Sequence, residues 1–161
     1  MAFTWTLTVD PLTTLLGFVH VQVEHRAGQY ASIYVGPSLK LINSPLGIAN
    51  GDYKGYGVEA GVRVFPWGKS PTGPWVMTRA VLADIVEASD VPGQRGGSEA
   101  GAYTSLLVGY TGIVPVGPAK KTGLVLSGGL GLSYFDYGPD PSAGGIHGFL
   151  PAAHTNIGWA F

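Results

Sequence analysis

The sequence contains no cysteine and very little charge. The absence of cysteine excludes a disulfide framework and any cysteine-ligated metal site. Only 12% of the 161 residues are charged, whereas an average soluble domain has roughly 25%, so this chain has few of the groups that keep a domain dissolved. The nine Lys and Arg and ten Asp and Glu give a net charge of −1 and form no basic stripe, which excludes a nucleic-acid partner held through phosphate contacts.

Long hydrophobic runs are also absent. No stretch approaches 18 uninterrupted apolar residues, so no transmembrane helix is expected. The first residues, Met-Ala-Phe-Thr-Trp-Thr, lack the features of a signal peptide, which fits a cytosolic protein or a mature chain with a new initiator Met. Apolar residues instead alternate with small or polar ones, which predicts strands and an all-β fold.

Eight strands are expected in one domain, residues 1–161. The first is uncertain because Asp10-Pro11 interrupts it, and Pro11 could be a kink or a turn. Several runs exceed ten residues, whereas soluble strands usually have about 5–6 and bilayer-spanning strands need about 9–11. Length therefore favours a closed, antiparallel, eight-stranded transmembrane β-barrel. The expected strands are residues 3–9, 16–25, 29–42, 54–65, 74–87, 99–114, 121–137 and 152–161.

The connections between these strands alternate in length. Residues 25–28, 66–73 and 115–120 form compact turns, while 43–53, 88–98 and 138–151 are longer and rich in Gly, Pro and Asp. Short turns on one rim and long loops on the other are typical of outer-membrane barrels. With eight strands, both chain ends lie on the short-turn rim.

The two faces of the strands differ in polarity. Val19, Val21 and Val23, for example, alternate with polar neighbours, and polar-in, apolar-out alternation fits a barrel surrounded by lipid. The residues expected to form a charge network in the lumen are Glu24, Lys40, Glu59, Arg63 and Arg79. The polar residues expected beside them are His20, Gln22, Tyr34, Ser127, His154 and Asn156.

Aromatic residues gather near the ends of the expected strands. Such positions fit interfacial girdles, in which amphipathic rings lie at the level of the lipid headgroups. The girdle is expected to contain Trp5, Trp67, Trp75, Tyr134 and Trp159.

The last ten residues, Ala-Ala-His-Thr-Asn-Ile-Gly-Trp-Ala-Phe, resemble the C-terminal assembly signal of bacterial outer-membrane proteins, with Ile157, Trp159 and Phe161 as its apolar positions. The wider pattern, including Asp10-Pro11-Leu12 and residues 57–63, resembles small eight-stranded outer-membrane barrels of the OmpA, OmpX and OmpW kind. It is most similar to a group of bacterial barrels with no established activity. The resemblance implies export with a signal peptide, insertion by the outer-membrane assembly machinery, and contact with lipopolysaccharide and phospholipid.

The interior of an eight-stranded barrel is just filled by side chains. Glu24, Glu59, Arg63 and Arg79 fall on neighbouring strands, where pairing would neutralise charges that are costly to isolate in a low dielectric. We expect a structural plug, with an ion or proton path through the same groups as the alternative.

Catalysis and cofactor binding have weak sequence support. Ser127 and His154 lie on adjacent expected strands, and Glu24 or Glu59 could orient the imidazole, but these side chains are expected to point into the lumen, away from lipid. His20 and His25 fall on opposite faces of a strand and cannot share a metal. The Gly runs lack the Lys-Ser/Thr of a phosphate loop. The chain is therefore expected not to be an enzyme and to need no metal or cofactor.

A structural or interaction role remains, through the long loops or the outer wall. Apolar residues at 46–48, 91–95 and 146–150 could contact a partner or fold over the barrel mouth. The outer wall could pack against another membrane protein or a second copy. Three alternatives stay open: a porin-like narrow channel for small ions or apolar solutes, a lipid-modifying hydrolase, and a soluble ligand-binding barrel.

Overall fold

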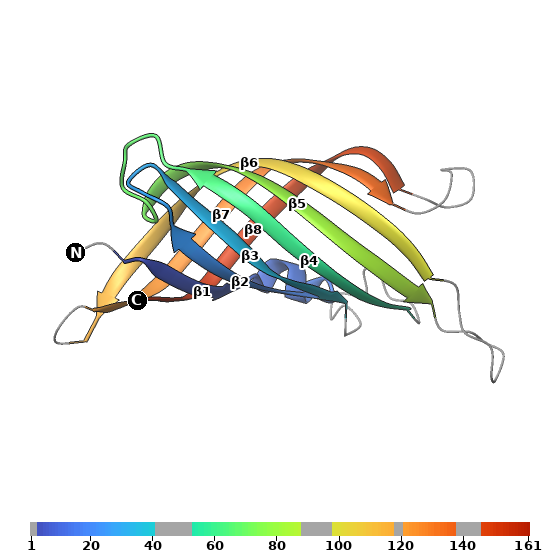
Figure 1. The fold of residues 1–161 in the computed structure, drawn as a ribbon, viewed down its shortest axis with the longest axis horizontal. Helices are drawn as coiled ribbons and strands as arrows, with labels where there is room; N and C mark the ends of the chain where they lie inside the picture. Colours follow the sequence, from blue (N-terminus) through green and yellow to red (C-terminus); the bar gives the residue numbers. More distant parts are fainter. Residues whose placement is uncertain (1–2, 41–52, 88–97, 118–120, 138–145) are drawn as a thin grey trace.

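The computed structural model describes residues 3–40, 53–87, 98–117, 121–137 and 146–161, which form one closed antiparallel barrel (Figure 1). Each strand pairs with its neighbours in the chain, and β1 closes the barrel against β8. A five-residue helix, α1 (Pro11–Leu15), connects the first two strands. The strands are β1 (Trp5–Val9), β2 (Phe18–Arg26), β3 (Ala31–Lys40), β4 (Tyr53–Val64), β5 (Gly73–Glu87), β6 (Ser98–Val116), β7 (Thr122–Tyr137) and β8 (Ile146–Ala160).

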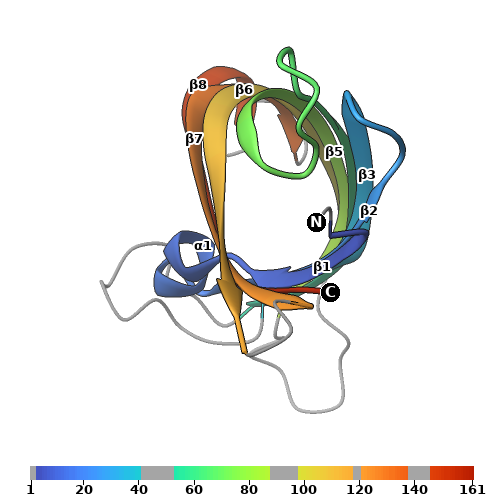
Figure 2. The same ribbon diagram turned by 90° about the vertical axis from the view of Figure 1, so that its left-hand side faces the viewer.

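The closing pair of strands brings the two ends of the chain together. Its register runs from Thr6 opposite Ala160 to Val9 opposite Ile157. Trp5 and Phe161 exchange both backbone hydrogen bonds, each with an N–O distance of 2.9 Å. Both termini therefore lie at the same end of the barrel (Figure 1), and Figure 2 shows the strands as a closed ring.

The predicted eight-stranded antiparallel barrel is confirmed, but the sequence analysis missed α1. The first strand ends at Val9, and Pro11 is neither a kink nor a simple turn, because it starts the helix. Asp10 caps α1, since its Oδ1 accepts hydrogen bonds from the backbone N–H groups of Leu12 (3.0 Å) and Thr13 (3.2 Å). An Asp cap followed by Pro at the first helical position is a helix-start signal. None of the described helices is long and apolar enough to cross a membrane.

The last strand begins earlier than expected, at Ile146 instead of residue 152. It pairs with β7 along its whole length, but with β1 only from Ile157 onward. Among the described residues, its first part therefore has a neighbouring strand on one side only. The odd-numbered residues of β8 direct their backbone groups toward the β1 side, as Phe161 does. Pro151 belongs to this set, so its missing N–H leaves the ladder with β7 intact.

Side chains alternate between an exposed apolar outer face and a buried inner face. On β3 every second residue, from Ser32 to Lys40, is buried. The inner face is unusually polar: its buried members include Glu59 at 0% exposure and Arg63 at 1%. The outer face carries large apolar side chains such as Leu106 at 62% and Leu130 at 68%. Most large apolar side chains of the described residues thus lie on the outer face, and the buried charged side chains lie on the inner face.

Candidate functional site: the barrel interior

The interior holds a network of charged and polar side chains contributed by most of the strands. Among the described residues, three carboxylates and three cations are buried, so the formal charges of these six groups cancel. The carboxylates are Asp10, Glu24 and Glu59, and the cations are Lys40, Arg63 and Arg79.

Arg63 makes the closest ion pair of the network. Its Nη1 donates to Glu24 Oε2 at 2.7 Å. Glu24 also accepts hydrogen bonds from the hydroxyls of Ser32 and Thr6. The Arg63 guanidinium carbon lies 5.3 Å from the centre of the Tyr34 ring and 5.2 Å from the ring of Trp75. The ion pair with Glu24 and the two aromatic faces together offset the desolvation free energy of the buried Arg63 guanidinium.

Glu59 is the centre of a second group. Its Oε2 lies 2.9 Å from His20 Nδ1, and its Oε1 accepts a hydrogen bond from Gln22 Nε2 at 2.7 Å. His20 Nε2 lies 3.2 Å from the Ser38 hydroxyl. With the Nδ1 proton directed at the carboxylate, Nε2 accepts from Ser38 Oγ–H.

The order Ser38–His20–Glu59 is that of a hydrolase triad, and the sequence analysis did not identify Ser38. The alternation of β3 was the available signal, because Ser38 shares a face with Tyr34 and Lys40. Ser38 is only 6% exposed, so an acyl carbonyl would have to displace its neighbours to reach Oγ. We therefore assign these hydrogen bonds to the packing of the interior.

Asp10 links α1 to the network from outside the strands. Its Oδ2 lies 3.2 Å from His154 Nδ1, and its Oδ1 accepts a hydrogen bond from Thr155 Oγ1 at 2.6 Å. Burial alone would raise the pKa of the Asp10 carboxyl, but the hydrogen bonds from His154 and Thr155 outweigh it and hold the pKa below its ordinary value. The helix cap and the interior thus share one carboxylate.

His154 and Asn156 extend the network along β8. Since His154 Nδ1 donates to Asp10, its Nε2 accepts from Arg63 Nη2 at 2.9 Å. Asn156 Nδ2 donates to Gln22 Oε1 at 2.8 Å; the reversed amide would instead accept from Arg63 Nη2. Gln22 uses its Nε2 to donate to Glu59, so its Oε1 is available to accept the hydrogen bond from Asn156 Nδ2.

Ser127, considered in the sequence as an alternative nucleophile beside His154, has no hydrogen bond to it among the described residues. Its hydroxyl lies 2.8 Å from Thr111 Oγ1, and it sits opposite Asn156 in the register of β7 and β8. The hydrolase alternative that paired Ser127 with His154 therefore lacks its hydrogen bond, whereas the expected lumen hydrogen bond of Ser127 is present. Lys40, at the end of β3, is buried with its ammonium 5.4 Å from the Phe18 ring.

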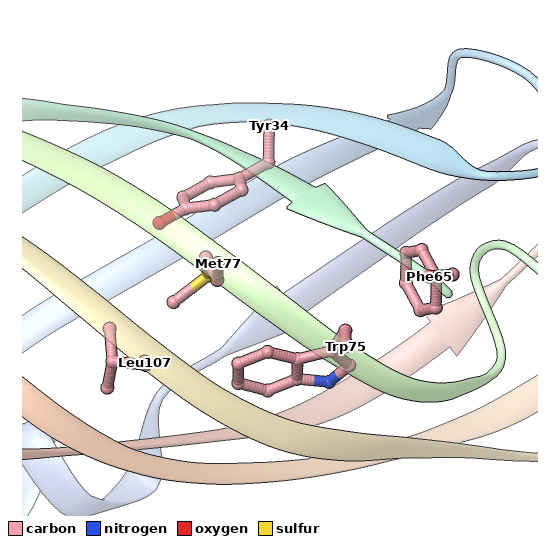
Figure 3. Close-up of a cluster of buried hydrophobic side chains, with 5 residues drawn as sticks. All are labelled: Tyr34, Phe65, Trp75, Met77 and Leu107. Carbon is pink, nitrogen blue, oxygen red and sulfur yellow. The ribbon is translucent and has the colours of Figure 1, made fainter. Parts of the chain in front are cut away.

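The interior also contains a group of buried hydrophobic side chains, some of which contact Arg63. Tyr34, Phe65, Trp75, Met77 and Leu107 form a buried cluster there (Figure 3). The prediction of Trp75 as a girdle residue is wrong, because Trp75 is 2% exposed and its Nε1 donates to Thr111 Oγ1 at 2.9 Å.

Glycines opposite Trp75 explain how the indole fits inside. The strand register places Trp75 beside Gly109, and Gly109 beside Gly129. A Cβ at either glycine would collide with the indole ring. Trp75 and Arg79 are four residues apart, so alternation puts them on the same face of β5, and Arg79 is among the predicted lumen charges. This spacing was the sequence signal that Trp75 points inward.

The remaining girdle residues are exposed. Trp5, Trp67 and Trp159 lie on the outside at 42%, 68% and 51% exposure. The exposed side chains also include Tyr134 and the expected assembly-signal residues Ile157 and Phe161.

Of the apolar loop segments, residues 46–48 and 91–95 lie outside the described part of the chain. Residues 146–150 belong to β8. Phe149 is 73% exposed and packs edge-on against Tyr134, with ring centres 5.1 Å apart. In the described part of the chain, no three His, Asp or Glu side chains form a metal-type cluster.

No protein-family model matches the chain, and comparisons with curated proteins and with solved structures find no significant match. The closed eight-stranded barrel is consistent with a small barrel protein, and the geometry of the interior and the outer wall is the basis for assigning a function.

Proposed function

We propose that this protein is an integral β-barrel of a Gram-negative cell envelope, inserted in the outer membrane in contact with lipopolysaccharide and phospholipid. Its role is structural or interactive, through the outer wall or the long loops, and involves no reaction of its own. The carrying observation is the inverted arrangement of side chains, with ion pairs inside and large apolar groups outside.

The outer wall supports a lipid environment energetically. Contiguous exposed apolar patches on soluble monomers seldom exceed a few hundred Å², whereas here exposed apolar side chains occur on every strand described from β1 to β8. In water, each fully exposed Leu or Val forgoes about 1.5–3 kcal/mol of burial free energy. Representative outward residues are Leu7, Val35, Val58, Leu82, Val108, Leu126 and Ile157.

The filled interior supports a structural plug over a porin-like channel. Arg63 and Trp75, the ends of one cation–π contact, are 1% and 2% exposed. Movement of either would leave buried polar groups without partners, which costs about 1–3 kcal/mol for each group and more for a charge. Passage of ions or apolar solutes would require such a movement.

The test is refolding in detergent, followed by gel electrophoresis with and without boiling. We expect a compact band that shifts on boiling, and no folded monomer in buffer without detergent. A Leu106→Lys variant should refold less well, because a cation on the lipid face costs about 2–4 kcal/mol at the midplane.

A matched Thr122→Lys control lies on an exposed position at the end of β7 and should refold normally. A folded, monomeric protein in plain buffer would overturn the proposal in favour of a soluble ligand-binding barrel.

A further inference from the structure

Arg79 is a buried cation whose guanidinium lies 3.4 Å or more from each polar atom that it contacts among the described residues. It is 5% exposed, yet its nearest carboxylate oxygen, Glu59 Oε2, is 3.9 Å away. Its Nη2 reaches Ser105 Oγ at 3.4 Å, its Nη1 lies 3.4 Å from His154 Nδ1, and its guanidinium carbon lies 5.4 Å from the centre of the Tyr103 ring. Its Nε has no hydrogen-bond partner among the described residues. Arg63, by comparison, has a carboxylate oxygen at 2.7 Å.

A second buried donor without a partner lies next to Arg79. Tyr34 is 4% exposed, and its hydroxyl has no hydrogen-bond partner in the described part of the chain. In Figure 3 this hydroxyl points away from Phe65. Two buried donors therefore lack an acceptor in the same layer of the barrel.

The strand register shows why the two donors are neighbours. Tyr34 on β3 is opposite Gly61 on β4, and Gly61 is opposite Arg79 on β5. A Cβ on Gly61 would collide with the Cε1 and Cζ atoms of Tyr34, so the ring lies across the glycine. The hydroxyl, attached to Cζ, is thereby carried over Gly61 toward the arginine.

The same row continues with hydroxyl groups. Arg79 is opposite Ser105 on β6, and Ser105 is opposite Ser133 on β7. The two serine hydroxyls lie 2.7 Å apart. One of these hydroxyls donates to the other, and the second keeps a proton that can be directed elsewhere.

We propose that Tyr34 Oη, Arg79 Nε and the Ser105–Ser133 pair bind a small inorganic anion of chloride size inside the barrel. The strand register places these N–H and O–H donors in one row of the barrel around a buried cation. Among the described residues, the carboxylate oxygen that pairs with Arg79 is Glu59 Oε2, at 3.9 Å. A monatomic anion accepts hydrogen bonds from any direction, so it could accept from the Tyr34 hydroxyl and the Arg79 Nε–H, the two donors without a partner among the described residues. The inference does not depend on the membrane location.

The test measures unfolding of the refolded protein in sodium gluconate that is replaced stepwise by sodium chloride at constant ionic strength. A ligand that binds only the folded state lowers the unfolding constant by a factor of 1 + [L]/Kd. Raising chloride from Kd to 100 times Kd should therefore reduce that constant roughly fiftyfold. Bromide, observed by anomalous diffraction of soaked crystals, should give a peak between Tyr34 Oη and Arg79 Nε.

Two variants assign the effect to this site. Tyr34→Phe removes one donor and keeps the ring, and should weaken the apparent chloride affinity about tenfold, as expected for a hydrogen bond to a charged group. Ser127→Ala removes a lumen hydroxyl that contacts Thr111 and should leave the chloride dependence unchanged. Equal stability in gluconate and chloride, with no bromide peak, would overturn the proposal and assign the position to water.

Discussion

At the scale of single residues, Arg63 shows how this interior is specified. Its side chain contacts a carboxylate, an imidazole, two aromatic rings and the Met77 sulfur. Lysine would keep the charge but could not offer the planar fork that reaches the Glu24 and His154 groups at once. The position therefore requires arginine for its geometry as well as its charge.

Removing one partner of the Arg63–Glu24 pair should cost more than removing both. We expect Arg63→Met to lower the free energy of unfolding by about 3–5 kcal/mol, because it leaves Glu24 buried without its cation. The double variant Arg63→Met with Glu24→Gln should recover a large part of this loss. Denaturant titration of the refolded proteins measures both values. A double variant as unstable as the sum of its single variants would contradict the pairing.

The identity of the interior residues was largely predictable from the sequence. Side chains alternate between the two faces of a strand, so the inward set follows from position along the strand and does not depend on the strand register. Glu24, Glu59, Arg63 and His154 lie inside as that parity indicates. Their partners were not predictable, because they depend on strand register and side-chain reach across the lumen. The one contradicted orientation, that of Trp75, came from judging an aromatic by its nearness to a strand end instead of by parity.

At the scale of elements, α1 depends on a carboxylate that also belongs to the interior. Asp10 caps the helix and contacts His154 and Thr155 on the last strand. A helix of five residues is too short to be stable alone. Its place is therefore determined by Asp10 and by the Leu12 N–H, which donates to Thr155 Oγ1 at 3.1 Å.

The contribution of Asp10 should depend on pH. Its pKa is lower in the folded state than its ordinary value of 3.8, so folding favours the ionised form. The resulting stability is present above pH 3.8 and is lost as the pH falls through the lowered folded pKa. We expect wild type to exceed Asp10→Asn in unfolding free energy at neutral pH, and the difference to shrink below about pH 4.

Thermal unfolding of both proteins between pH 3 and 7 tests this expectation, with Asp84→Asn, an exposed position on β5, as the control. A difference between wild type and Asp10→Asn that stays constant over this range would show that the carboxylate contributes no charge-dependent stability.

The strands were predicted more accurately than their connections. Long alternating runs identify strands because period two persists over many residues. The α1 segment has too few residues to display a helical period, and only Asp10-Pro11 marked it. The start of β8 was missed because residues 138–151 were assigned to a long connection rich in Gly, Pro and Asp. Pro151 is compatible with the strand, since its nitrogen faces the side without a described neighbouring strand.

At the scale of the whole molecule, the four tryptophans divide between the two faces of the barrel. Trp5, Trp67 and Trp159 are exposed, and only Trp75 is buried. If the barrel is inserted in a bilayer as proposed, brominated acyl chains should reach the outward rings and should not contact the indole across Gly109 and Gly129. Fluorescence quenching in vesicles can therefore determine which face meets lipid.

We expect a single-tryptophan protein that retains Trp159 to be strongly quenched by brominated lipid, and one that retains Trp75 to be quenched several-fold less. Trp67, in the 66–72 connection, should show an intermediate value that depends on the depth of the bromine label. Equal quenching of Trp75 and Trp159 would contradict the inverted barrel.

The unequal lengths of β1 and β8 have a consequence for the behaviour of separate molecules. Among the described residues, the part of β8 before Thr155 has no strand beside it on the β1 side and presents a row of backbone groups there. Such rows can serve as templates for strands of other chains. Pro151 removes the N–H donor from the middle of that row. A strand from another molecule could not form an uninterrupted ladder there, so we expect Pro151 to disfavour intermolecular pairing along this part of β8.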